Sequence, residues 1–243
     1  MTIRYKEYEF AQGWASVSQI CGLPAKEYLY GWYAKLGMEA YRINDHSKKI
    51  GQLIDNEICH YFGDENTGEL DRSVLEHPES KAFYIQAIHN FHTMVEHLNP
   101  KSIMGQKVVY SKDHKYIGTF DRLLLIDGKL VLSDWKATNY VDYPYKMQLE
   151  AYYRALIEMI NSGIIVLDGQ YEWHEYPLWI VQFPKKEKVD LEKNIIKFKP
   201  KELRWNNFLN LLNYFYGKQK DEQEEKPVKI QKEKSKRRIK NDK

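Results

Sequence analysis

The first hundred residues of the chain carry apolar positions at helical spacing. Residues 15–43 predict short helices with an aromatic inner face, interrupted by a glycine and a proline soon after Cys21. Residues 47–62 predict an amphipathic helix that begins at Ser47, and residues 78–98 predict another. The inward positions of these two helices are Ile50, Leu53, Ile54, Ile58, Phe62, Tyr84, Ile88, Phe91, Val95 and Leu98.

After residue 100 the pattern changes to one typical of strands. Segments rich in branched and aromatic residues predict strands at 106–111, 115–126, 129–137 and 173–183. A helix is expected over 142–160, with Asp142 as its N-cap and Pro144 in its first turn. An edge strand or loop is expected over 189–198, and a closing helix over 202–216. This order predicts an α/β (α+β) fold with a mixed central β-sheet flanked by helices.

The composition indicates one domain followed by a charged tail. The 243 residues are 43% hydrophobic, which suffices for one substantial core. We expect a single domain over 1–217, made of a helical part (1–100), a sheet core (101–198) and a closing helix (200–217). Residues 218–243 hold 11 Lys and Arg against 6 Asp and Glu, a net charge of +5, which leaves −2 for the rest of a chain of +3. Because this basic tail has few apolar residues, we expect it to be disordered, and it serves either nucleic-acid contact or solubility.

Several classes of protein are disfavoured by the sequence. No apolar run reaches 18 residues, so we expect no membrane span, and the charged start "MTIRYKEYEF" favours a cytoplasmic protein. The two cysteines, Cys21 and Cys59, support neither a disulfide framework nor a four-cysteine zinc or iron–sulfur site. His89 and His92 lie three apart on a predicted helix without an acidic or cysteine partner, so we expect a structural role for them.

The pair Asp127-Gly128 lies between two apolar runs and predicts a β-hairpin. If these two residues form the loop, the residue numbers of facing positions sum to 255. This register places Asp121 directly opposite Asp134 on one face of the sheet. Lys136 lies two residues beyond Asp134, so it projects from the same face.

Two facing carboxylates destabilise a sheet unless something compensates their charge. Mg²⁺ accepts one or two carboxylates together with water and phosphate oxygens, and a neighbouring lysine can stabilise charge at a phosphate. This set therefore predicts metal-assisted phosphodiester hydrolysis. The alternative is an ordinary hairpin with charged ends in solvent. The hairpin is apolar on both faces, as in a central strand, which favours the site.

The helix that follows carries Gln148 and Tyr152 at positions i and i+4, on one face. An amide and a phenol there can bind a phosphate or orient a water. The spacing alone is weak evidence, because such pairs often occur by chance.

These residues resemble the core of the PD-(D/E)xK nuclease superfamily, in particular its RecB-like and lambda-exonuclease-like members from phages and mobile elements. The family pattern is a Gly-x-x-Asp strand, a hairpin, Asp/Glu-x-Lys, and a helix with Gln-x-x-x-Tyr. The chain has "GTFD" ending at Asp121, "DWK" from Asp134 to Lys136, and "QLEAY" at 148–152, in that order. The segment from Trp14 also resembles the opening of the phage members, so the similarity extends to about Phe198.

The resemblance implies a restriction-endonuclease-like core with a helical N-terminal segment. It makes Asp121 and Asp134 metal ligands, with the backbone carbonyl of Trp135 as a further ligand and Lys136 as the catalytic lysine. Gln148 and Tyr152 would shape the site and contact DNA. The implied cofactor is Mg²⁺, for which Mn²⁺ can substitute, and no iron–sulfur cluster is possible with two cysteines.

The chain departs from the family in the helix that usually supplies a histidine ligand. Asp55 stands at the histidine position and Cys59 at the usual glutamate. Asp55 remains a candidate oxygen ligand for Mg²⁺, with Glu57 as an alternative. The strand before "GTFD" often carries an acidic residue, but here it has Gln106 and Lys107, to which we assign no catalytic role.

The resemblance implies a Mg²⁺-dependent deoxyribonuclease, and an exonuclease of phage-type DNA recombination or repair is the favoured form. The alternatives are a structure-specific endonuclease of the same fold and a weakly catalytic DNA-binding accessory protein. DNA is the expected partner, with a single-strand annealing protein as a second candidate that the basic tail could contact. If the protein is phage-encoded, it would act in the cytoplasm of a bacterial host. The sequence leaves open the polarity, the strand preference and the oligomeric state.

Overall fold

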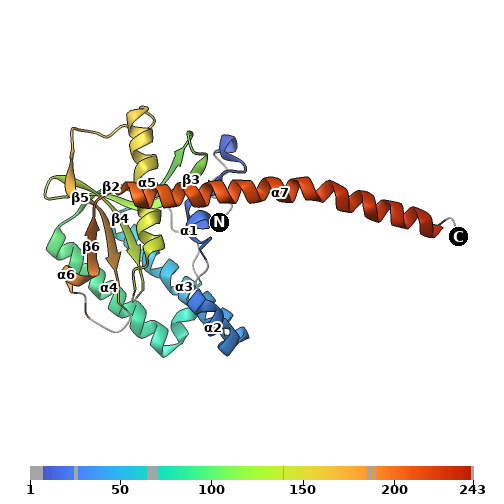
Figure 1. Cartoon of the computed structure of the whole chain (residues 1–243). Coiled ribbons are helices and arrows are strands. Elements are labelled where there is room, and N and C mark those ends of the chain that lie inside the picture. Colours follow the sequence, from blue (N-terminus) through green and yellow to red (C-terminus); the bar gives the residue numbers. More distant parts are fainter. Residues whose placement is uncertain are drawn as a thin grey trace.

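The computed structural model describes residues 8–24, 27–64, 71–138, 140–184, 188 and 190–241, and it has a mixed α/β architecture (Figure 1). In chain order the helices are α1 (Val17–Cys21), α2 (Glu27–Leu36), α3 (Met38–Tyr61), α4 (Pro78–Leu98), α5 (Tyr143–Asn161), α6 (Leu191–Asn194) and α7 (Glu202–Asn241), with short 3-10 turns η1 (Glu9–Ala11) and η2 (Arg72–Glu76). The strands are β1 (Ala15–Ser16), β2 (Lys101–Ser111), β3 (Tyr116–Ile126), β4 (Lys129–Lys136), β5 (Glu172–Gln182) and β6 (Ile195–Phe198).

These six strands form one mixed sheet, which confirms the expected fold class. The order along the sheet is β1-β3-β4-β5-β6, and β2 also pairs with β3. The β2–β3, β3–β4 and β5–β6 pairs are antiparallel, whereas β1–β3 and β4–β5 are parallel. The β4–β5 connection includes α5, because a parallel pair needs a long crossover.

Helices cover both faces of the sheet and bury two apolar clusters. One cluster joins α1, α5 and α7 to the sheet and contains Phe120, Leu123, Leu132, Leu149 and Phe208. The other joins α3 and α4 to the opposite face and contains Ile54, Phe91, Leu124, Val131 and Trp179. From Leu123 to Ile126 of β3 and from Leu130 to Leu132 of β4, successive residues alternate between the two cores, as expected for central strands.

The helix expected over 47–62 begins earlier than the sequence suggested. In the structure α3 starts at Met38, so Ser47 lies inside the helix and is not its N-cap. The backbone break occurs at Gly37, which has a φ of +53° that glycine adopts readily. Asp142 does occupy the N-cap position of α5, although its side chain makes no capping hydrogen bond.

The tail expected to be disordered from residue 218 is instead the continuation of α7, which is helical as far as Asn241. The first part of α7 packs on the domain through Trp205, Phe208 and Leu212, and the rest extends away from it (Figure 1). Lysine, glutamate and glutamine have high helix propensity, so a charged segment can continue a helix that packing has already started. The last two residues, 242 and 243, lie outside the described residues.

Candidate active site

The β3–β4 hairpin has the predicted register. Its pairs run from Ile126 with Lys129 to Arg122 with Ser133, and the residue numbers of each pair sum to 255. Asp127 and Gly128 have φ values of +51° and +75°, as a two-residue type I′ turn requires. The ladder ends one step before Asp121, whose Oδ2 accepts a hydrogen bond from the backbone N–H of Trp135 at 2.8 Å.

Asp134 and Lys136 form a close ion pair at the end of β4. The Nζ of Lys136 lies 2.9 Å from Oδ1 of Asp134 and 2.8 Å from Oδ2. The Asp134 side chain is 1% exposed, and its Oδ2 has no hydrogen bond of good geometry despite this contact. A buried carboxylate oxygen that accepts no hydrogen bond can still bind a cation.

The electrostatics of the pair follow from its burial. The pKa of Asp134 is raised to about 7: burial is the largest cause, Lys136 opposes it, and the neighbouring Asp121 adds to it. Burial acts to lower the pKa of Lys136, but Asp134 and Asp121 outweigh it and hold that pKa above its usual value. Lys136 therefore remains an ammonium at neutral pH. The raised pKa of Asp134 means that its surroundings disfavour the ionised carboxylate.

Tyr145 is a further residue at this place that the sequence analysis overlooked. It lies in the first turn of α5, and the Nζ of Lys136 is 5.5 Å from the centroid of its ring. Burial raises the pKa of its phenol, an effect that Lys136 opposes. No motif in the sequence indicates this contact, because it depends on how α5 packs against the end of β4.

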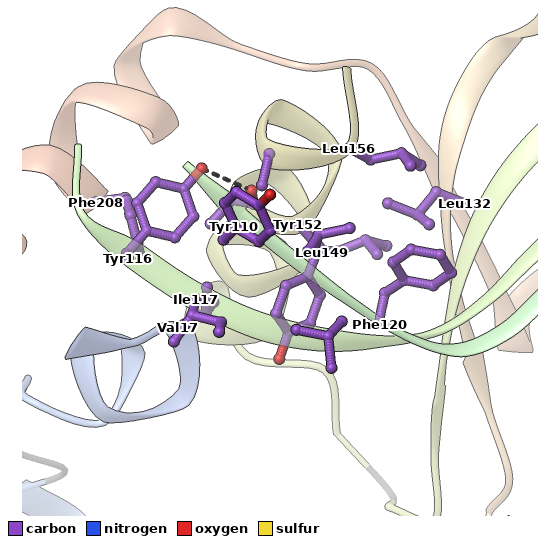
Figure 2. Close-up of a cluster of buried hydrophobic side chains, with 14 of the residues drawn as sticks. Val17, Tyr110, Tyr116, Ile117, Phe120, Leu132, Leu149, Tyr152, Leu156 and Phe208 are labelled. Carbon is purple, nitrogen blue, oxygen red and sulfur yellow. Dashed lines mark hydrogen bonds between the residues drawn. The ribbon is translucent and has the colours of Figure 1, made fainter. Parts of the chain in front are cut away.

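Gln148 and Tyr152 are brought together, but Tyr152 faces the core. The Nε2 of Gln148 donates to the hydroxyl of Tyr152 at 2.8 Å, and Tyr152 is 4% exposed. Figure 2 shows Tyr152 among buried side chains that include Val17, Ile117 and Phe120. Burial leaves Tyr152 little surface for DNA, and its expected contact with DNA stays a prediction.

The same tyrosine explains the glycine of the "GTFD" segment. A Cβ on Gly118 would overlap the ring of Tyr152 and touch Val17 of α1. Nearby, the hydroxyl of Tyr116 donates to the carbonyl of Ala151 at 3.0 Å, the dashed line in Figure 2. Gly118 therefore lets α5 approach β3 closely, which helps to set α5 beside the hairpin that carries Asp121.

Asp55 is held by a residue of β2, the strand that pairs with β3. The Nε2 of Gln106 lies 3.0 and 3.3 Å from the two carboxylate oxygens of Asp55, on α3. Asp134 continues the positions of β4 that face α1 and α5, whereas α3 covers the opposite face. The tentative assignment of Asp55 as a metal ligand stays a prediction. Glu57 is engaged elsewhere, with the hydroxyl of Tyr84 at 2.8 Å.

Gln106, to which the sequence analysis assigned no role, thus holds Asp55. It lies between the pairs Gly105–Arg122 and Lys107–Phe120 of the β2–β3 ladder, so it is the residue of β2 level with Asp121. Its φ of +46° is unusual for a residue other than glycine and redirects its side chain. A positive φ at glutamine leaves no signal in the sequence.

Arg122 was also overlooked by the sequence analysis. It follows Asp121 and points to the opposite face, where it is 1% exposed and its Nη2 lies 2.5 Å from Oδ2 of Asp64. Its guanidinium also covers the ring of Phe62 at 4.4 Å from the centroid. This cluster attaches β3 to the segment that follows α3. The sequence did contain a signal for this contact, namely an arginine within an otherwise apolar strand.

The donor set is suited to a hard divalent cation. Among residues 8–24, 27–64, 71–138, 140–184, 188 and 190–241, no three His, Cys, Asp or Glu side chains are placed to hold a metal ion. Asp121 and Asp134 nevertheless offer two adjacent carboxylates, which fits the one or two protein carboxylates that Mg²⁺ commonly takes beside water and phosphate oxygens. The backbone carbonyl of Trp135 as an additional ligand stays a prediction.

Comparison with models of known protein families gives no match, and a search of curated proteins gives none either. Within the described part of the chain, none of the helices is both long and apolar enough to cross a membrane.

Proposed function

We propose that this protein is a Mg²⁺-dependent DNA nuclease, and that it acts as an exonuclease in phage-type recombination or repair. The observation that carries the proposal is the convergence of Asp121, Asp134 and Lys136 at one end of the central hairpin. Asp134 is 1% exposed and its pKa is raised, so the arrangement costs folding free energy. Strained electrostatics of this kind concentrate at functional sites.

The roles of the side chains follow from their chemistry. A divalent cation held by Asp121 and Asp134 would supply Lewis-acid stabilisation of a phosphodiester and a bound water of lowered pKa. Lys136 remains protonated, so it can donate to a phosphate oxygen or hold the attacking water. The Trp135 N–H fixes the carboxylate of Asp121 in orientation. Hydrolysis would leave 5′-phosphate and 3′-hydroxyl ends.

The direct test compares Asp121→Ala and Lys136→Ala with the parent on linear duplex and single-stranded DNA, with Mg²⁺ or Mn²⁺ and with EDTA. Asp113→Ala is the matched control, because Asp113 is an exposed carboxylate in the β2–β3 turn. We expect a loss of at least roughly 100-fold for each site variant and parental activity for the control. Site variants as active as the parent would refute the proposal.

Closed circular DNA separates the two modes of cleavage. An exonuclease requires an end and leaves a closed circle intact, whereas a structure-specific endonuclease of the same fold cuts it. A cytoplasmic location and a single-strand annealing partner are further parts of this proposal.

One observation favours a second candidate, a DNA-binding accessory protein with little or no cleavage. Within the described part of the chain, no third Asp, Glu, His or Cys side chain joins Asp121 and Asp134 to hold a metal ion. Metal-independent DNA binding without cleavage in Mg²⁺ or Mn²⁺ would support this candidate over the nuclease.

A further inference from the structure

We infer that Tyr145 is a positioning residue for the site. The ammonium of Lys136 has two interaction partners, the carboxylate of Asp134 and the ring of Tyr145. The inference rests in part on the proposed function, because it assigns Lys136 a role at a phosphate. It also makes a claim about the isolated protein, which can be tested without any activity.

The backbone at Lys136 is fixed, so that only the side chain can move. The carbonyl of Lys136 accepts hydrogen bonds from the N–H groups of Thr138 and Phe183, at 3.0 and 2.8 Å. Lys136 also pairs with Gln182 in the β4–β5 ladder. A lysine side chain with four methylenes on such a fixed base can place its ammonium at different points within a short radius.

Two partners of different kinds lie within that radius. Asp134 contacts Nζ with both oxygens, at 2.9 and 2.8 Å, and the ring of Tyr145 has its centroid 5.5 Å from Nζ. A lysine ammonium within about 6 Å of an aromatic centroid is attracted by the negative face of the ring. The attraction grows where water is excluded, and the Lys136 side chain is 22% exposed.

The second partner is important for metal binding, because a divalent cation and the ammonium of Lys136 compete for the carboxylate of Asp134. Because Nζ lies within 2.9 Å of both oxygens of Asp134, a divalent cation that takes Oδ2 must move the ammonium away from that oxygen. Without the ring, the displaced ammonium would lose a partner in a poorly solvated place. Tyr145 therefore lowers the free-energy cost of that displacement and keeps the ammonium close to the site.

Two variants separate the ring from simple packing. Tyr145→Phe keeps the ring and removes the hydroxyl, whereas Tyr145→Leu keeps apolar volume and removes the ring. Tyr153→Leu is the matched control, because Tyr153 is a half-buried tyrosine of the same helix whose ring contacts Trp173 at 5.0 Å. A packing role alone predicts similar behaviour for the Leu variants at positions 145 and 153.

The first measurement is Mn²⁺ affinity of the DNA-free protein, by electron paramagnetic resonance or calorimetry, together with kcat and KM on DNA. We expect Tyr145→Leu to weaken Mn²⁺ binding and lower kcat by roughly 5- to 30-fold each, with KM nearly unchanged. Tyr145→Phe should retain both values, and Tyr153→Leu should leave Mn²⁺ affinity unchanged. Equal losses in the Phe and Leu variants, or no loss in either, would overturn the inference.

The second measurement needs neither metal nor activity. A double-mutant cycle with Tyr145→Leu and Lys136→Met in EDTA measures the coupling of the two side chains in the unfolding equilibrium. We expect a coupling of roughly 5- to 30-fold in the equilibrium constant, and no coupling between Tyr153→Leu and Lys136→Met. Absence of coupling sinks the inference. If coupling is present but the parent does not cleave DNA, the proposed function fails and the positioning contact stands.

Discussion

Replacing Asp134 with asparagine should make the metal-free protein more stable at neutral pH. Asparagine has nearly the same shape as aspartate but cannot ionise, and the site where Asp134 lies disfavours a charge. In the folded protein burial and Asp121 raise the pKa of Asp134 to about 7, from a usual value of 3.8. The unfolded chain is expected to have the usual value.

The sign of the effect follows from these two pKa values. Below about pH 4 the carboxyl group is protonated in both states and has no effect on their difference. Between about pH 4 and pH 7 the unfolded chain loses this proton while the folded chain keeps it, so the free energy of unfolding falls as the pH rises. Above about pH 7 both states are ionised and the fall stops. Lys136 remains charged throughout this range.

The size of the effect follows from the same numbers. A pKa difference of about three corresponds to about 4 kcal/mol, since each pKa unit is worth about 1.4 kcal/mol. Relaxation of the site and entry of water reduce this value, so about 4 kcal/mol is the upper bound. The free energy of unfolding of the parent should thus fall by about 2–4 kcal/mol relative to Asp134→Asn between about pH 4.5 and pH 8.

The assay is urea denaturation of both proteins in EDTA at a series of pH values. The difference between the two proteins removes contributions from all other titrating groups. Asp113→Asn, at an exposed carboxylate, controls for the loss of one negative charge. A difference that does not change with pH would refute the electrostatic reasoning. Mg²⁺ added at pH 8 should stabilise the parent and leave Asp134→Asn nearly unaffected.

Three further substitutions test the packing that supports the site, each by urea denaturation. Gly118→Ala should destabilise by about 1–3 kcal/mol, because its Cβ overlaps the ring of Tyr152, and the added change Tyr152→Leu should recover part of this loss. Asp64→Asn should cost about 3 kcal/mol, because it removes the carboxylate that pairs with the buried guanidinium of Arg122, whereas Arg122→Met should cost less, since Asp64 is partly exposed and can be hydrated. Gly128→Ala should cost about 1 kcal/mol through its φ of +75°, and equal stability to the parent would contradict the type I′ turn.

The hairpin and the helices around it could be predicted from residues that are close together in the sequence. Asp127 and Gly128 are residues that adopt positive φ, so they selected a two-residue turn, and this turn determined the register through Arg122 and Ser133. The helical spacing of apolar residues likewise predicted α4 and α5 closely. These features depend on neighbours in the chain, which are visible in a single sequence.

The ends of helices were harder to predict because they depend on small free energies. Nothing between Gly37 and Ser47 breaks a helix strongly, so α3 extends back to Met38. The charged residues beyond Gly217 favour a helix as much as they favour disorder, and α7 continues through them. A serine or a charged run alone does not decide such a boundary.

Only the tertiary structure decided which residues join Asp121, Asp134 and Lys136. Alternation along β4 places Asp134 and Lys136 on the face covered by α5, and packing then sets Tyr145 against Lys136. The same packing places α3 on the other face, where Asp55 pairs with Gln106. Lys136 and Tyr145 are 9 positions apart and Asp55 and Gln106 are 51 apart, and both pairs meet according to how helices dock on a sheet. That geometry comes from the shapes of whole faces, which no short pattern in the sequence encodes.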